Sequence, residues 1–241
     1  MTANKKLNIV NNHGESIVGI LETKSAIDAG RQQPRIILIS HGVLGHKDYL
    51  FFRLLAEELP FSSFRFDFRG NGESDGKAGY AHMKEDADDI ATVAAHFEKE
   101  GYEVYGIIGH SRGAVACLKY ASSCKKPIPH VINCSGRYKM NDNQIYKNRP
   151  EIGASLDKHG YFDWSVKQRD RITNIKVTRE DVDKFTSWDN SYGNEKYTTY
   201  HLCFDCAWYQ RQYCSCLQCR HVRQCDSQPH AGLTSRSRSQ L

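Results

Sequence analysis

The sequence predicts an α/β fold, in which a doubly wound, mostly parallel sheet carries helices on both faces. The first two thirds of the 241 residues alternate strand-like and helix-like segments, a pattern typical of parallel sheets. Arg35–Ser40 is a continuous apolar run, as expected of a strand buried on both faces. Glu103–Ile108 leads into Gly-His-Ser-Arg-Gly at residues 109–113 and then into a helical segment. The length suits one such domain around a single large core.

The expected elements follow in chain order from their local patterns. Leu7–Val10 and Ser16–Leu21 form a leading hairpin, with Asn-His-Gly at residues 12–14 as its turn. Glu85–Glu100 is an amphipathic helix, and Gly101 is its expected C-cap. The other expected elements are a helix over Lys47–Leu59, a strand over Ser63–Phe68, a helix over Arg112–Ser122 and a strand over His130–Cys134.

After Gly136 the pattern becomes polar and rich in aromatic side chains. We interpret residues 137–196 as a small cap or lid that is inserted over the sheet and then returns to the core. Thr-Arg-Glu-Asp at residues 178–181 resembles a capped helix start within it. The alternative is a surface excursion that packs against nothing. The predicted division is therefore a core with the nucleophile turn over 1–136, the cap over 137–196, and an aberrant, disordered tail over 197–241.

Ser111 is the candidate nucleophile. In a Gly-x-Ser-x-Gly turn between strand and helix, the Ser adopts a strained backbone, which small neighbours on both sides permit. The strain displays the Ser Oγ at the end of the sheet, where the following helix N-terminus favours negative charge. The alternative is a glycine-rich turn whose Ser has no chemical role.

An oxyanion hole is predicted beside Ser111. Ser-His-Gly-Val follows the buried strand at residues 40–43, and its turn would aim the backbone N–H of Val43 at a carbonyl oxygen that gains charge. The backbone N–H of Arg112, directly after the nucleophile, would be the second donor. Two fixed donors of this kind stabilise the transition state of acyl transfer.

Three motifs occur in register on successive strands: His-Gly at residues 41–42, Asp-x-Arg-Gly-x-Gly-x-Ser at residues 67–74, and Gly-x-Ser-x-Gly at residues 109–113. In this order they resemble the α/β-hydrolase superfamily. The likeness is greatest to small intracellular serine hydrolases of the feruloyl-esterase and monoacylglycerol-lipase kind, often labelled serine aminopeptidase-like. It covers roughly residues 7–200 and does not fix the substrate.

The resemblance implies an α/β-hydrolase fold with a small cap. It also implies hydrolysis of a carboxylic ester, less readily of an amide, with Ser111 attacking the carbonyl. The partner would be a small-molecule ester, and no cofactor is implied. In such hydrolases the residue at the position of His41 shapes its turn and is not the base, while Asp67 and Arg69 are expected to shape their own loop.

The resemblance fails where the acid and the base should follow the nucleophile in the order Ser, Asp, His. No segment matches the His-Gly-x-x-Asp-x-x-Val-Pro pattern that carries the acid, so the C-terminal strands are expected to be missing. The available residues lie in the expected cap or in the tail: Asp163, Asp189, Asp205, Asp226, His201, His221 and His230.

The tail has an unusual composition. After Lys196, Cys, Gln, Arg and Ser dominate, which does not suit strands buried on both faces. Reading each codon one base later from about Leu202 permits a strand, the missing acid segment, a second strand and a late His. Codon degeneracy leaves freedom at the middle base of each new codon, but some positions are forced, and Trp208 can only become Gly. We therefore favour a frameshift, which makes the chain as given a truncated or catalytically inactive hydrolase.

The cysteines leave a second interpretation of the tail open. A cytosolic chain keeps its thiols reduced, so a disulfide framework is not expected. Cys203-x-x-Cys206 and Cys216-x-x-Cys219 have a spacing that could hold zinc, which would make the tail an interaction module. Three of the nine cysteines lie in apolar contexts and are expected to be buried thiols: Cys117, Cys124 and Cys134.

Charge and hydropathy exclude other classes of function. The net charge of +5 is modest and the basic residues are interspersed with acids, which argues against nucleic acid as a partner. No apolar run is long enough to span a membrane. The segment Met1–Lys6 lacks the apolar stretch of a signal peptide, so a cytoplasmic location is expected. Nothing in the sequence sets the oligomeric state.

Overall fold

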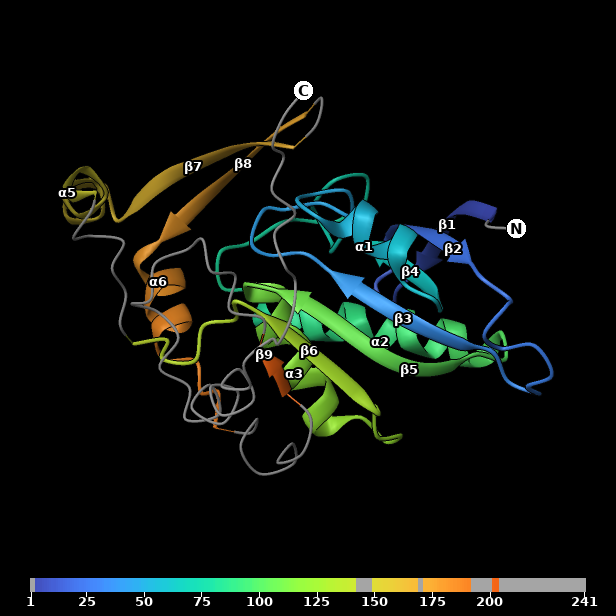
Figure 1. The fold of residues 1–241 in the computed structure, drawn as a ribbon. Helices are drawn as coiled ribbons and strands as arrows, with labels where there is room; N and C mark the ends of the chain where they lie inside the picture. Colours follow the sequence, from blue (N-terminus) through green and yellow to red (C-terminus); the bar gives the residue numbers. More distant parts are fainter. Residues whose placement is uncertain (1–2, 142–148, 169–170, 192–200, 204–241) are drawn as a thin grey trace, which may run out of the picture.

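The computed structural model describes residues 3–141, 149–168, 171–191 and 201–203. Its centre is a seven-stranded sheet in the order β1-β2-β4-β3-β5-β6-β9 (Figure 1). β2 is antiparallel to both β1 and β4, and the remaining pairings are parallel. The strands are β1 (Ala3–Val10), β2 (Ser16–Thr23), β3 (Arg35–Ser40), β4 (Ser62–Phe66), β5 (Glu103–His110), β6 (His130–Cys134) and β9 (His201–Cys203).

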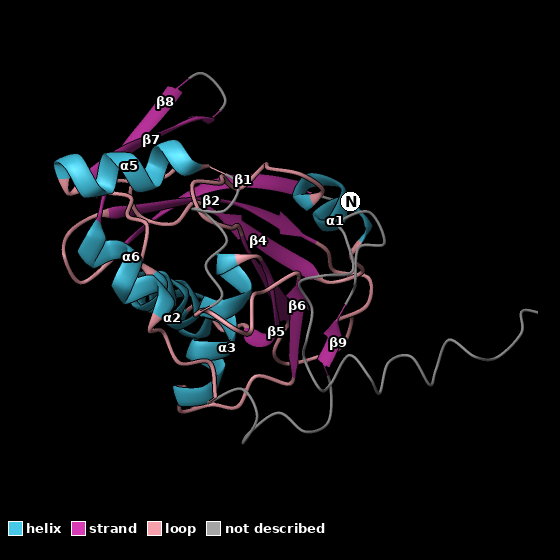
Figure 2. Cartoon of the chain, turned by 90° about the vertical axis from the view of Figure 1, so that its left-hand side faces the viewer, coloured by secondary structure: helices cyan, strands magenta, loops and turns pink. Residues whose placement is uncertain are grey.

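Helices cover both faces of this sheet, as the alternating pattern predicts (Figure 2). α2 (Met83–Lys99) and α3 (Arg112–Ser123) pack on one face, where their apolar side chains join the largest core cluster. α1 (Phe52–Glu58) packs on the other face, with Phe52 buried against Ile37 and Ile39 of β3. The predicted α/β class and its mostly parallel sheet are confirmed.

One predicted helix begins later than its sequence pattern indicates. The pattern favours a helix over Lys47–Leu59, but α1 begins at Phe52. Leu50 has a φ of 53°, in the left-handed region, which a right-handed helix cannot include. The Lys47 amide and ammonium group both bind the buried Asp67 carboxylate, so tertiary contacts hold the first part of this segment in a loop.

Residues 150–186 form α5 (Pro150–His159), a two-stranded antiparallel sheet of β7 (Tyr161–Gln168) and β8 (Arg171–Thr178), and α6 (Arg179–Thr186). The sequence pattern did not predict this β-hairpin. It did predict the start of α6, where Thr178 and Asp181 make a reciprocal capping box. These elements are not an unpacked excursion, because their apolar side chains form a cluster with Leu44 and Tyr80 of the core.

A seventh strand lies in the segment that we expected to lack strand character. β9 pairs in parallel with β6, from Val131 opposite His201 to Asn133 opposite Cys203. The free edge of β6 offers main-chain groups to which another strand can pair. The segments 192–200 and 204–241 lie outside the described residues, so β9 is the one part of the predicted tail, residues 197–241, that the structure describes.

We expect truncation of Phe64 to be strongly destabilising. Phe64 is fully buried in β4 and packs against the rings of Phe66 and Phe97. Phe64→Ala should lower the free energy of unfolding by about 3–5 kcal/mol in urea titrations, because it leaves a large cavity. Leu54→Ala is the control, since Leu54 is 59% exposed and should change stability by less than about 0.5 kcal/mol. Equal effects of the two substitutions would contradict this core assignment.

Candidate active site

Ser111 lies between the end of β5 and the first residue of α3, as predicted. Its φ of 54° and ψ of −121° are strained for a residue with a side chain. The Ser111 amide donates a hydrogen bond to the Cys134 carbonyl at 2.9 Å, which ties the turn to the end of the neighbouring strand β6. The sharp strand-to-helix turn that the motif predicts is therefore present.

The two glycines of the motif are required by close backbone contacts. A Cβ at Gly109 would lie 2.5 Å from the Gly113 carbonyl oxygen. A Cβ at Gly113 would lie 2.3 Å from the His41 carbonyl oxygen. Both contacts are with main-chain atoms, which cannot move aside cheaply. Gly113 thus allows the start of α3 to touch the segment that leaves β3.

That segment, residues 41–45, is here named the His41 loop. A Cβ at Gly42 would lie 3.0 Å from the Cβ of Ser111, so the loop lies directly against the candidate nucleophile. Val43, the first predicted oxyanion donor, follows Gly42. Leu44 has a φ of 50°, which is strained, and its side chain is buried. The structure thus brings the two predicted donor segments together at Ser111.

The His41 side chain shapes this loop. The Phe68 amide donates to His41 Nε2 at 3.0 Å, so Nδ1 carries the proton and donates to the Gly42 carbonyl oxygen at 2.7 Å. Burial lowers the pKa of His41 to about 4, and the nearby Asp67 carboxylate only partly opposes this effect. A neutral imidazole with both nitrogens engaged cannot act as a base toward Ser111, which agrees with the implied turn-shaping role.

Arg112, the second predicted donor residue, is the first residue of α3, so its backbone amide has no acceptor within the helix. Its buried guanidinium donates to Asp86 through Nε at 2.7 Å. It also donates to the carbonyl oxygens of Gly79 and Tyr80. Burial raises the pKa of Asp86 to about 7, although the Arg112 charge opposes the shift. Sequence reasoning missed Asp86, whose only signal was a carboxylate beside the apolar face of a helix.

Asp67 and Arg69 have structural roles in their own loop, as the resemblance implied. The fully buried Asp67 accepts hydrogen bonds from the Lys47 amide, the Lys47 ammonium group and the Glu73 amide. Arg69 binds Asp89 of α2 through its side chain and its amide. These contacts fix residues 67–74, here named the Asp67 loop, beside the His41 loop.

The acid and the base of a serine hydrolase are not assembled within the described part of the chain. Among those residues, no imidazole or carboxylate hydrogen-bonds to Ser111 Oγ. His110 packs its ring near Phe51 and Phe52, and burial lowers its pKa. Asp163 is exposed on β7, and Asp189 binds Ser191. The side chain of His201 and all of Asp205, His221, Asp226 and His230 lie outside the description.

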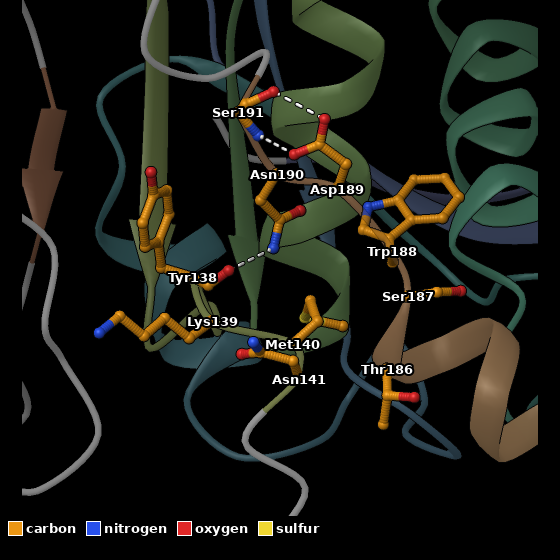
Figure 3. A pocket seen from close by; sticks show the side chains of 10 residues that line it. All are labelled: Tyr138, Lys139, Met140, Asn141, Thr186, Ser187, Trp188, Asp189, Asn190 and Ser191. Carbon is orange, nitrogen blue, oxygen red and sulfur yellow. Dashed lines mark hydrogen bonds between the residues drawn. The ribbon is translucent and has the colours of Figure 1, made fainter.

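A pocket of about 330 Å³ lies between the loop after β6 and the loop after α6 (Figure 3). Asn190 joins the two loops by donating to the carbonyl oxygens of Arg137 and Tyr138. Met140, which lines the pocket, is buried in a cluster with Val115 of α3, one turn after Ser111. The pocket therefore lies on the side of α3 that the inserted elements cover.

Neither a metal site nor a membrane span is found among the described residues. They contain no group of three His, Cys, Asp or Glu side chains that could hold a metal ion, and none of their helices is long and apolar enough to cross a bilayer. The cysteines proposed to bind zinc lie outside the described side chains. Cys117 and Cys134 are buried as predicted, and burial raises the pKa of Cys117 to about 12. Cys124 is only half-buried, because it lies at the C-terminal end of α3.

Comparison with known families identifies the chain. A family model described as "Serine aminopeptidase, S33" matches residues 31–197, which is more than half of the sequence. The chain belongs to the serine aminopeptidase S33 family of α/β-hydrolases. The match begins before β3 and includes the His41 loop, the Asp67 loop and Ser111, so this S33-family protein keeps the three motifs in their family order.

Relatives of this S33-family protein are distant. An uncharacterised Saccharomyces cerevisiae protein, YDL057W, is 27% identical where the two align, over 51% of this chain and 46% of the yeast protein. The chain thus matches about half the length of that curated relative. Est1E of Butyrivibrio proteoclasticus, solved with ferulic acid bound, has a TM-score of 0.59 at 20% identity, over 81% of this chain and 76% of that one.

Two further solved structures share the fold. The α/β hydrolase GrgF of Penicillium sp. sh18 has a TM-score of 0.56 at 16% identity, over 80% of this chain and 77% of that one. The Pyrococcus furiosus esterase PF2001 has a TM-score of 0.54 at 18% identity, over 81% of this chain and 64% of that one. At these identities the likeness shows the α/β-hydrolase fold and nothing finer.

We expect acid to destabilise the protein through His41. The folded state keeps this imidazole neutral down to about pH 4, whereas the unfolded chain protonates it below about pH 6.5. The stabilisation that follows from keeping this imidazole neutral is fully present above pH 6.5 and is lost as the pH falls to about 4. The loss amounts to about 3 kcal/mol in the free energy of unfolding. His41→Gln keeps an acceptor for the Phe68 amide but does not titrate, so urea titrations should show a flatter stability profile between these pH values.

The control is His13→Gln, because His13 is exposed in the hairpin turn. This variant should keep the pH dependence of the unmodified protein. A His41→Gln profile with the original slope would show that the buried imidazole does not carry the effect.

Proposed function

We propose that this chain is by descent a carboxylic ester hydrolase that acts by nucleophilic acyl transfer through Ser111. Amides are the less favoured substrate class. The observation that carries the proposal is the strained Ser111 backbone at the junction of β5 and α3, with Gly42 of the His41 loop directly against it. Such a turn displays a nucleophile at the end of a sheet.

In the proposed reaction, Ser111 Oγ attacks the ester carbonyl, and the oxygen that gains charge accepts hydrogen bonds from the Val43 and Arg112 amides. Two supports favour these donors. The Arg112 amide opens α3 and has no acceptor within the helix, and Val43 follows the glycine that contacts Ser111. Preorganised donors of this kind contribute several kcal/mol, since removal of one costs roughly 2.7–4 kcal/mol.

The inserted elements of residues 150–186 would act as the cap over the substrate. Their cluster with Leu44 and Tyr80 holds them on the His41 loop, and the pocket in Figure 3 lies at their junction with the loop after β6. An apolar or aromatic acyl group of a small-molecule ester is the class of ligand that such a cap covers. The chemistry needs no cofactor, and we place the protein in the cytoplasm.

The alternative is a chain of the same family that is catalytically inactive as given. No described imidazole or carboxylate hydrogen-bonds to Ser111 Oγ, and β9, the last described strand, ends at Cys203, next to the point at which we place the frameshift. Loss of a triad member leaves a residual acceleration of roughly 10³–10⁴ over water from the oxyanion hole and binding. A zinc-binding tail is the remaining alternative, and a measurement of bound zinc in the purified protein tests it directly.

We expect restoration of the reading frame after about Leu202 to raise hydrolysis of p-nitrophenyl acetate by roughly 10²–10⁴ in kcat, because it would supply the missing acid and base. Ser111→Ala in the restored chain should abolish this gain without changing the melting temperature. Ser122→Ala is a matched control, because Ser122 lies on the same helix, about three turns beyond Ser111, and its hydroxyl donates to the Lys119 carbonyl.

A restored chain that hydrolyses the ester no faster than its Ser111→Ala variant would refute the proposal. A chain, as given, that hydrolyses the ester well while nucleotide reads across the codons for residues 190–241 support the present frame would instead refute the frameshift and the inactive alternative.

A further inference from the structure

The side chain of Gln168 joins three segments that lie far apart in the sequence. It is 3% exposed at the end of β7. Its Nε2 group donates to the carbonyl oxygens of Leu44 at 2.8 Å and Gly45 at 3.1 Å, both in the His41 loop. The same nitrogen lies 3.1 Å from Asn71 Oδ1 in the Asp67 loop.

The other end of the amide is engaged as well. Gln168 Oε1 accepts from the Gly72 amide at 2.9 Å and from the Thr173 hydroxyl of β8 at 3.0 Å. The carbonyl oxygens on one side and a backbone N–H on the other fix which way the amide points. A buried amide with all its groups satisfied costs little to bury and is costly to disrupt.

The Gln168 contacts reach a strained part of the His41 loop. Leu44 has a positive φ and directly follows Val43, the proposed oxyanion donor. Strained residues persist only where their surroundings hold them. Gln168 fixes the Leu44 carbonyl oxygen, while the Leu44 side chain is buried among residues of the inserted elements. The two peptide groups that follow Leu44 are therefore held from β7, directly after the strained residue and Val43.

We infer that Gln168 is a positioning residue for the proposed reaction: its amide holds the His41 loop against the Asp67 loop and thereby aims the Val43 amide at the substrate oxygen. This inference rests on the proposed function. It also gives the β7–β8 hairpin a second role besides covering the substrate, because the hairpin holds the loop that carries the proposed oxyanion donor.

The test compares two isosteric substitutions, made in the full chain for hydrogen exchange and in the frame-restored chain for activity. Gln168→Glu replaces the donating nitrogen by an oxygen that faces the Leu44 and Gly45 carbonyl oxygens, which repels the loop. Asn11→Asp is the matched control, because it makes the same amide-to-carboxylate change in a buried side chain of the turn between β1 and β2. Its side-chain nitrogen donates to Glu15, so the His41 loop should not respond.

Two measurements are made on each variant: hydrolysis of p-nitrophenyl acetate and hydrogen exchange of the backbone amides of residues 42–47 and 70–74. Gln168→Glu should lower kcat about 10- to 100-fold with KM nearly unchanged, since a misplaced donor weakens only transition-state binding. It should also speed exchange in residues 42–47, and Asn11→Asp should do neither. Thr173→Val, which removes one of the two donors to Oε1, should give a smaller effect of the same kind.

The inference is overturned if Gln168→Glu and Asn11→Asp lower kcat equally, or if exchange in residues 42–47 rises while kcat is unchanged. Failure of the proposed function gives a different result, in which the frame-restored chain shows no hydrolysis that depends on Ser111. In that case the exchange of residues 42–47 alone decides whether Gln168 holds the loop.

Discussion

Main-chain contact between the His41 loop and the start of α3 is the constraint on which the rest of the structure depends. Any side chain at Gly113 would collide with the His41 carbonyl, and a Cβ at Gly42 would lie 3.0 Å from the Ser111 Cβ. The parallel strands β3 and β5 end side by side at this contact, with Ser40 opposite Gly109. The strained backbone of Ser111 is the local cost of turning there from strand to helix.

Buried ion pairs hold the loops around this point. Lys47 pairs with Asp67, Arg112 with Asp86, and both members of each pair are almost completely buried. Replacing such pairs by apolar side chains is often neutral for stability, whereas removing one partner leaves an uncompensated charge. Their value here is geometric, since Lys47 ties the segment after the His41 loop to the Asp67 loop, and Arg112 ties the start of α3 to α2.

The elements inserted after β6 hold the His41 loop from the side on which the substrate is proposed to bind. Apolar contacts with Leu44 and Tyr80 attach the hairpin and its flanking helices to the core, and Gln168 adds a directional contact to the His41 loop. Apolar packing alone tolerates small shifts, but hydrogen bonds to main-chain groups do not. The combination suits a site in which a backbone donor must keep its direction while a cap covers the ligand.

The sequence by itself determined the elements whose signal is local. Period and composition located β3 and β6 without error, the capping residues located the start of α6, and the spacing of Gly109, Ser111 and Gly113 located the turn. Each of these follows from the conformational preferences of neighbouring residues. The family order of three motifs then linked the turn to the His41 and Asp67 loops.

Only the tertiary structure decided the rest. The late start of α1 depends on a buried Lys47–Asp67 contact, and the β7–β8 hairpin has polar exposed positions that resemble a loop. Asp86 and Gln168 carried no local signal for their roles. Gln168 binds a carbonyl oxygen 124 residues away, and a partner at that separation is chosen by folding of the whole chain, not by its neighbours in sequence.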